Sequence, residues 1–487
     1  MERKLSLALF LLATAATAQT ERAAFTQSGH GASLTFATDY QCIGINPANL
    51  AWPRKYKEKK VTFGIGELGY SLTSSAFDRA GLKDDLVKGL MDPPDDFTYA
   101  EKVDAAKQFD GATLGMNADA MQVGVAFFTD SAGGFAFTMR DRVQWYSSFN
   151  TTVAQIMFEG YFAPYFDLLV LDSIGGPMIA NDASVTEDQR DRTVQGLSSN
   201  GQKVSKLMDG SAFDFLWYRE YGLSYGRKLS GSPTFDLYGG LGVKYLSGFG
   251  MIQVKSDGGE FIGQSALSPG FDIDYGADAK KNPSHVEGDG FKSVGKGFAV
   301  DIGLSAVIHD KVKIGLSYVD LGSITWDGNV YVAADSSVDA LEENGFDNYN
   351  FFDQADNFST DVGIFEWNGV SDVKVKLPST LRTGVGYVAS DKLELGFETV
   401  LPMNEEPGAY RKAVIALGAD YRPAPWISLN TGLTTGGLYP ARVPFGVVFA
   451  VPSGAWEAGF ALRDVLSLGG GGDPTLSGCF GLLRFRV

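Results

Sequence analysis

The chain has 487 residues, of which 44% are hydrophobic, 13% aromatic and 20% charged. Its formal net charge of −17 argues against nucleic acid as a partner, because a phosphate backbone requires a basic surface. Two cysteines are too few for a disulfide framework, and no apolar run reaches the roughly 20 residues that a membrane-spanning helix needs. The 60 glycines and the aromatic content instead suit curved strands with aromatic girdles.

The first residues of the sequence have the pattern of an export signal. An apolar run from Leu5 to Ala16 follows two basic residues and leads into Ala16-Thr17-Ala18, which has the form of a cleavage site. Residues 1–18 are therefore predicted to be a secretory signal peptide, with the mature chain beginning near Gln19. A buried N-terminal helix is the alternative.

Residues 19–60 show little alternation and are predicted to form an N-terminal periplasmic or plug segment. Within them, Asn46-Pro47-Ala48 initiates a turn, because the proline ring disfavours the helical conformation for Asn46. The stretch from Ala37-Thr38-Asp39 to Asn46-Pro47-Ala48-Asn49-Leu50 resembles the N-terminal hatch motif of FadL-like outer-membrane barrels.

The remainder, residues 61–487, alternates with period two, most clearly in Gly297–Leu321. Fourteen strands are predicted: Val61–Ser74, Ala112–Phe128, Phe135–Phe149, Ala212–Lys228, Thr234–Phe249, Gly297–Ile308, Val312–Thr325, Ser379–Val388, Lys392–Leu401, Arg411–Arg422, Trp426–Thr434, Val443–Val451, Ala455–Arg463 and Gly478–Val487. Most have at least the 9–11 residues of a tilted membrane strand.

The connections between these strands alternate between short and long. Tight turns such as 229–233 and 309–311 contrast with loops such as 150–211 and 326–378. Short turns on one rim and long loops on the other are typical of outer-membrane barrels. The sequence thus predicts an all-β fold, a fourteen-stranded antiparallel transmembrane barrel with a short plug and long extracellular loops, in the outer membrane of a Gram-negative cell.

One parity of the strands is apolar and the other carries charges. The residues predicted to face the lumen include Arg140, Arg142, Asp214, Glu220, Asp301, Arg382, Glu394 and Glu398. Such groups must pair or meet water, and a plugged, hydrated lumen would satisfy them. The opposite set, including Phe298, Ile302, Leu395 and Phe460, is predicted to face lipid. A soluble barrel would reverse the two faces.

Two strands lose their alternation, near Ala120 and Met121 and near Gly66. A one-residue slip flips the faces of a strand, so a bulge or kink is expected at each place. One interpretation is an ordinary bulge, and the other is a kink that opens the wall sideways.

In the last strand, parity places Cys479 on the apolar outer side, which argues against a disulfide with Cys42.

A second stretch, Lys376-Leu377-Pro378-Ser379-Thr380-Leu381-Arg382-Thr383-Gly384-Val385-Gly386-Tyr387, is similar to a late FadL-family pattern. The resemblance as a whole is to a divergent branch of that superfamily. It implies transport of fatty acids or other hydrophobic compounds, with lateral release through the wall. No ligand-contacting residue of that family can be matched individually.

Two loops carry further hypotheses. Thr152–Ile174 is apolar and aromatic, and either packs over the barrel mouth or captures a ligand or partner. The loop 326–378 is rich in Asp and Asn, including Asp347, Asp353 and Asp356. Its spacing matches no EF-hand, so a solvated acidic loop is favoured over a Ca²⁺ site.

No catalytic residues, metal site or cofactor are predicted, because the three histidines lie in separate regions and no nucleotide or nucleophile motif occurs. The predicted partners are outer-membrane lipid and a hydrophobic small molecule, without nucleic acid. The leading hypothesis is a non-enzymatic barrel that admits hydrophobic, fatty-acid-like molecules through a plugged lumen with a lateral exit. The alternative is a structural or secretion-associated barrel whose long loops dock a protein.

Overall fold

A computed structural model describes residues 29–54, 58–78, 81, 96–273, 275, 279–349, 364–437, 439–469 and 475–487. The signal peptide and part of the acidic loop, including Asp353 and Asp356, lie outside these residues. No helix within the described part of the chain is long and apolar enough to cross a membrane.

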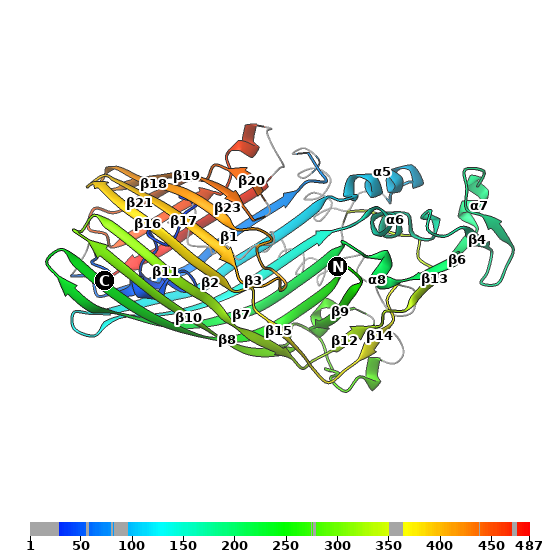
Figure 1. The fold of residues 1–487 in the computed structure, drawn as a ribbon, viewed down its shortest axis with the longest axis horizontal. Helices are drawn as coiled ribbons and strands as arrows, with labels where there is room; N and C mark the ends of the chain where they lie inside the picture. The colour runs from blue at the N-terminus through cyan, green and yellow to red at the C-terminus, as the bar shows by residue number, and fades with distance from the viewer. Residues whose placement is uncertain are drawn as a thin grey trace.

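The fold is a closed antiparallel barrel of fourteen strands, as the alternation predicted (Figure 1). Its strands are β1 (Val61–Ser74), β2 (Thr113–Thr129), β3 (Gly133–Ser148), β7 (Ala212–Ser232), β8 (Phe235–Asp257), β10 (Gly295–Ile308), β11 (Val312–Trp326), β16 (Thr380–Ser390), β17 (Leu393–Pro402), β18 (Val414–Ala424), β19 (Ile427–Gly436), β21 (Phe445–Ala450), β22 (Trp456–Leu462) and β23 (Thr475–Arg486). Each strand pairs with the next along the chain, so the topology is a simple meander.

The barrel closes where β1 meets β23. Thr62 pairs with Arg486 and Phe63 with Phe485, and the two phenyl rings stack at 5.2 Å. Closure leaves no free sheet edge around the wall, which is the condition for a sheet to cross a membrane.

Apolar side chains cover the outside of the wall. Phe298 is 65% exposed, Ile302 47%, Leu395 42% and Phe460 50%, whereas the charged residues on the opposite parity are buried. This is the reverse of a soluble protein, and it is the arrangement of a barrel in lipid.

Two bulges interrupt β1 and β2 at the same level of the wall. Gly66 takes a left-handed conformation with φ of 67°, and it lies opposite Gln122 where the β1–β2 pairing skips one position. The β2–β3 register shifts between Met121 and Val123, so the extra residue is Gln122 rather than Ala120. As a result Met121 faces the lumen and packs against the plug. Pairing resumes at once on both sides, so the wall is closed here.

Both cysteines are buried and free, in line with the expectation that they do not pair. The parity argument behind it is wrong for Cys479, which is 1% exposed and packs against Val448 and Ala461. The register between β22 and β23 shifts between the pairs Glu457–Arg484 and Gly459–Gly481. This shift turns the side chain of Cys479 toward the lumen. Burial also raises the pKa of the Cys42 thiol well above its usual range.

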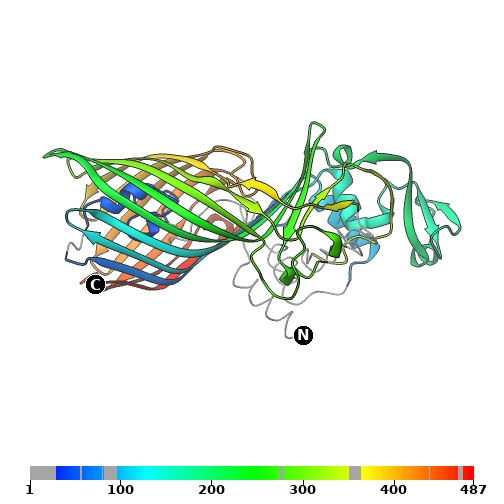
Figure 2. The ribbon, with the colours of Figure 1, turned by 90° about the horizontal axis from the view of Figure 1, so that it is seen from below.

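Several strands continue beyond the wall at the end that carries the long loops (Figure 2). Beyond the wall, β8 pairs with β9 (Glu260–Leu267), which pairs with β12 (Val330–Ala333), and β12 pairs with β14 (Trp367–Gly369). The end of β11 pairs with β15 (Val373–Lys376), and the end of β19 pairs with β20 (Tyr439–Arg442). A separate four-stranded sheet projects further, formed by β4 (Leu168–Leu171), β5 (Met178–Ala180), β6 (Thr193–Lys203) and β13 (Ser337–Leu341). The sequence prediction missed all of these strands.

In the part of the chain that the structure describes, the α-helices at this end are α5 (Tyr99–Phe109), α6 (Thr151–Glu159), α7 (Glu187–Asp191) and α8 (Val204–Leu207). Helix α5 begins with a capping box between Thr98 and Glu101, and α6 begins at Asn150, whose side chain accepts the Val153 amide. Two short 3₁₀ helices, η1 (Asp39–Cys42) and η2 (Pro47–Ala51), lie inside the barrel near the opposite end, where the connections are short (Figure 2).

Candidate functional site

The lumen is occupied by residues 29–54, which carry η1 and η2. In the motif Asn46-Pro47-Ala48, Asn46 caps η2 by accepting the Ala48 amide at 3.0 Å. Its side-chain amide donates to the Leu304 carbonyl of β10 at 3.1 Å. One side chain therefore both starts the helix and ties it to the wall, which gives a local reason for the Asn-Pro pair.

The wall facing this motif is lined with glycine. A Cβ added to Gly240 would lie 2.3 Å from the Pro47 carbonyl carbon, and one added to Gly226 would lie 2.4 Å from the Pro47 oxygen. A Cβ on Gly303 would lie 2.0 Å from Asn46 Oδ1. Because these three positions of β7, β8 and β10 carry no side chain, η2 can approach the backbone of the wall. Sequence reasoning missed these residues, although glycine on the polar parity of successive strands was a visible signal.

Buried carboxylates hold the plug at three further points. Glu398 accepts the amides of Ser33 at 2.5 Å and Leu34 at 3.0 Å, while Arg382 donates to Glu398 at 2.8 Å. Asp301 accepts the Gly44 amide at 3.1 Å. These are charge-assisted hydrogen bonds to the backbone, which are stronger than neutral ones.

Two more contacts come from the strands that close the barrel. Glu67 of β1 accepts the Tyr40 hydroxyl at 2.5 Å. Arg484 of β23 binds Asp39 of η1 at 2.5 Å. The plug is thus bound to strands on both sides of the closure.

Above the plug, a layer of buried ions fills the middle of the lumen. Lys244 binds Asp301 at 2.7 Å and Asp320 at 2.5 Å, and all three side chains are at most 1% exposed. Arg142 lies 3.5 Å from Asp320 and 3.9 Å from Glu220, and its guanidinium donates to Tyr218. Buried charges at this density are stable only as a mutually compensated network.

A backbone irregularity builds this layer. Asp320 has φ of 62°, a conformation that is uncommon for a non-glycine residue, and the β10–β11 register shifts beside it, between Val300 and Ile302. The shift lets the Asp320 amide donate to Asp301 at 2.9 Å while its carboxylate faces Lys244.

The remaining predicted lumen residues also lie in buried or nearly buried pairs. Arg140 binds Asp119 at 2.9 Å, Asp214 accepts from Arg411 at 2.6 Å, and Glu394 pairs with Lys313. The structure therefore brings Arg142, Glu220 and Asp301 into one network, and Arg382 and Glu398 into another. The partners Asp119 and Asp320 were not predicted, because both lie next to breaks in the alternation.

A cavity of about 260 Å³ opens between the plug and the wall at the short-turn end. Its lining mixes cations and carboxylates: Arg54, Lys59, Lys313, Arg422, Arg484 and Arg486 with Asp39, Glu394, Asp420 and Glu457. Apolar side chains line the rest of the cavity, including Phe36, Leu50, Trp52, Phe128, Ile427 and Val448, so its surface is part charged and part apolar.

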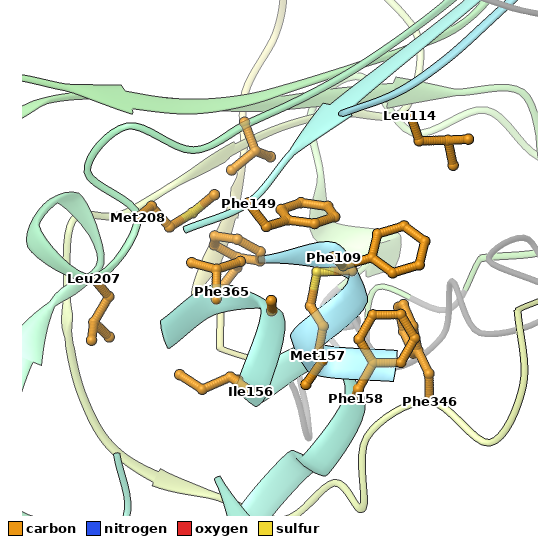
Figure 3. Packing of buried hydrophobic residues seen from close by; sticks show 14 of the residues in the cluster. Phe109, Leu114, Phe149, Ile156, Met157, Phe158, Leu207, Met208, Phe346 and Phe365 are labelled. Carbon is orange, nitrogen blue, oxygen red and sulfur yellow. The ribbon is translucent and has the colours of Figure 1, made fainter. Parts of the chain in front are cut away.

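The opposite, long-loop end has an apolar core. Phe109 of α5 and Phe158 of α6 lie 5.0 Å apart, and Phe346 packs against Phe158 at 5.7 Å (Figure 3). The same cluster contains Leu114 of β2 and Trp145 of β3, so it runs from the loop helices to the end of the wall. We refer to this cluster as the mouth core.

The loop Thr152–Ile174 contributes to the mouth core rather than exposing its apolar residues. Phe158 and Phe166 are fully buried, whereas Ile174 at its end is 65% exposed. This geometry supports packing over the mouth. Burial also raises the pKa of Glu159, at the end of α6, to about 7, with Lys107 opposing the shift.

Asp347 of the acidic loop forms an ion pair with Lys102 of α5 at 2.7 Å. Among the described residues, no three His, Cys, Asp or Glu side chains are grouped as metal ligands would be. Asp347 thus has a structural role in holding the loop against the mouth.

Comparison with known families gives one match, to a family of unknown function (DUF5723) over residues 192–437. That range is half of the chain. The chain belongs to this family. No curated protein matches it.

Solved structures similar to this DUF5723 member include two toluene transporters and a FadL homologue. The Pseudomonas putida toluene transporter TodX is 10% identical, with 96% of this chain and 98% of that one covered and a TM-score of 0.41. The Ralstonia pickettii toluene transporter TbuX is 10% identical, with 94% and 96% covered and a TM-score of 0.41. A Pseudomonas aeruginosa FadL homologue is 13% identical, with 97% and 99% covered and a TM-score of 0.38.

The last of these belongs to the family that the two sequence motifs resemble. Because the identities and TM-scores are low, the fold of this DUF5723 member rests on its own strand pairing, and no ligand is carried over.

Proposed function

We propose that this DUF5723 member is exported by its signal peptide to the outer membrane and admits hydrophobic small molecules through its plugged lumen. The observation that carries the proposal is the mouth core. Apolar helices and loops meet the upper lumen there, on a barrel whose outer wall is apolar. Partition of an apolar solute into such a core is favourable, whereas partition into the charged lumen below is not.

The ion layer and the plug make a straight passage to the short-turn end unfavourable for an apolar molecule. The paired bulges at Gly66 and Gln122 supply a way out through the wall, because hydrogen bonding between β1 and β2 is already interrupted there. The wall is closed in this structure, so release requires β1 and β2 to separate at the bulge. The proposed substrates are apolar or fatty-acid-like.

Uptake of radiolabelled oleate and toluene by cells that express the barrel tests the proposal, in a host lacking its own long-chain fatty-acid transporter. Phe158→Ala should lower uptake, because it removes a central side chain of the mouth core. Phe460→Ala, on the lipid face, is the matched control and should leave uptake unchanged. Equal uptake by cells with and without the barrel would refute transport.

A disulfide staple tests the exit separately. Ile65→Cys with Val123→Cys joins two paired outward positions beside the bulge. Val61→Cys with Phe127→Cys joins the same strands at the rim and serves as the control. Only the first staple should block uptake, and a reductant should restore it; block by both or by neither would exclude exit at the bulge.

A second candidate function is docking of a protein partner at the projecting sheet. Met178 of β5 is 55% exposed, and Ile174 in the turn between β4 and β5 is 65% exposed, on a sheet that lies away from the barrel (Figure 2). Photo-crosslinking from position 178 in intact cells tests it. One stoichiometric protein adduct would favour docking, and labelling of lipid alone would count against it.

A further inference from the structure

One side of the outer wall carries a row of cations just above the apolar band. Strand pairing aligns Arg219 of β7 with Ser247 of β8, then Lys296 of β10, Thr325 of β11 and Lys374 of β15. Lys376 lies in the next row down, opposite Ser323. Because residues paired across strands share a face, these side chains form one continuous outward belt, which slants across the wall with the tilt of the strands.

The belt residues are accessible. The side chain of Lys296 is 62% exposed and that of Arg219 is 31% exposed, and Lys374 and Lys376 are also exposed. Neighbouring strands lie about 4.8 Å apart, so β7 to β15 spans roughly 20 Å of wall.

An aromatic row lies directly beneath the belt. Tyr221, Tyr245 and Phe298 are paired in register, with ring centroids 6.0 Å and 5.4 Å apart. Aromatic rings in this arrangement mark the boundary between hydrocarbon and headgroups.

The height of the belt agrees with this boundary. Lys296 and Ile308 stand near the two ends of the membrane part of β10. At about 3.3 Å per residue and a tilt of about 40°, the stretch between them rises roughly 30 Å, which is the thickness of the hydrocarbon. Lys296 therefore lies at the level of the outer-leaflet headgroups, and the belt crosses that level on β10.

Few carboxylates oppose the belt. Asp141 is held by Arg219 at 2.8 Å, and Asp327 lies 3.9 Å from Lys296 with half of its side chain exposed. Glu406 lies in the loop after β17. Burial raises the pKa of Glu406, and the nearby charge of Lys376 opposes this rise. Four cations in one belt stand out in a chain whose net charge is −17.

We infer that this belt binds the phosphates of a phosphorylated glycolipid of the outer leaflet, with the acyl chains lying on the apolar wall below. Lysine and arginine at headgroup level attract lipid phosphate, and the hydroxyls of Ser323 and Thr325 add hydrogen-bond donors between them. The inference rests on the outer-membrane location in the proposed function, and not on transport.

The test measures retention of bisphosphorylated lipid A by the barrel in neutral detergent, using native mass spectrometry and titration. Lys296→Gln with Lys374→Gln removes two belt charges. Lys311→Gln with Lys392→Gln removes two exposed charges at the opposite rim and is the control. The belt variant should bind lipid A about tenfold more weakly or worse, while the control should match the wild type.

Equal affinity of the belt variant and the control for lipid A would overturn the inference. Equal binding of dephosphorylated lipid A would overturn it as well, and so would binding of inorganic phosphate alone. Oleate uptake measured on the same variants separates the two proposals. Loss of lipid A binding with normal uptake supports the belt, and lipid A binding in a barrel without uptake refutes transport alone.

Discussion

Lys244 and Asp320 form a 2.5 Å ion pair at the centre of the barrel, although they are 76 residues apart in the chain. Both side chains are at most 1% exposed, and Asp301 completes the site at 2.7 Å from the same amine. The pair lies between the plug and the mouth core, so it stabilises the wall at the level where the plug ends.

Lys244→Met should lower the free energy of unfolding by about 3–5 kcal/mol, because two buried carboxylates lose their cation. Denaturant unfolding of the barrel in micelles measures it. Lys228→Met is the control, since Lys228 pairs with Asp236 with half of its side chain exposed, and it should cost at most about 1 kcal/mol. Adding Asp320→Asn to Lys244→Met should recover part of the loss; a purely additive double variant would contradict the coupling.

Glu398→Ala should release the first turn of the plug. The amides of Ser33 and Leu34 lose a charged acceptor, which is worth about 1.5–3 kcal/mol, so their hydrogen exchange should speed up by about tenfold or more. Hydrogen-exchange mass spectrometry of residues 29–54 measures this. Glu394→Ala, which removes the partner of Lys313, should leave these two amides protected.

The wall could be predicted from the sequence because one face of every strand is apolar and the other is not. Alternation is a local signal, and it survives in each strand separately. It failed for Cys479, since this residue lies beside a register shift that reverses the faces of the strand. The residue types alone do not show where a strand contains one extra residue.

The candidate site was only half visible for the same reason. Arg142, Glu220 and Asp301 were predicted as lumen residues, but which charge meets which depends on register around the barrel. Asp320 enters the network only through its left-handed backbone. The mouth core could not be predicted, because its helices are short and are buried by residues from segments far apart in the chain, such as Phe109 and Phe346.

Gly240→Ala should displace η2 from the wall. The new Cβ would lie 2.3 Å from the Pro47 carbonyl carbon, and backbone cannot yield as a side-chain tip does, so a cost of about 1–3 kcal/mol is expected. Gly239→Ala on the outer face is the neighbouring control, because its Cβ would meet only the end of Leu229 at 2.8 Å. Faster exchange of the η2 amides in Gly240→Ala alone is the expected result; equal exchange in both variants would show that η2 does not depend on this approach.

The stability of the loop-end helices should fall as the pH rises from about 4.5 to about 7. Burial raises the pKa of Glu159 from 4.5 to about 7, so between these values the folded state holds a proton that the unfolded state has lost. Stability contributed by that proton is fully present below the lower value and is lost as the pH passes the upper one. With solvent screening, the change should be about 1–2 kcal/mol.

Glu159→Gln should remove this pH dependence, since the amide does not ionise. At pH 8 the variant should be more stable than the wild type, and at pH 5 the two should be nearly equal. Thermal unfolding followed by proteolysis of α5 and α6 at both pH values measures the difference. Glu187→Gln, on exposed α7, controls for charge and should keep the wild-type slope. A parallel pH profile in wild type and Glu159→Gln would show that another group near the mouth core controls the stability of this end.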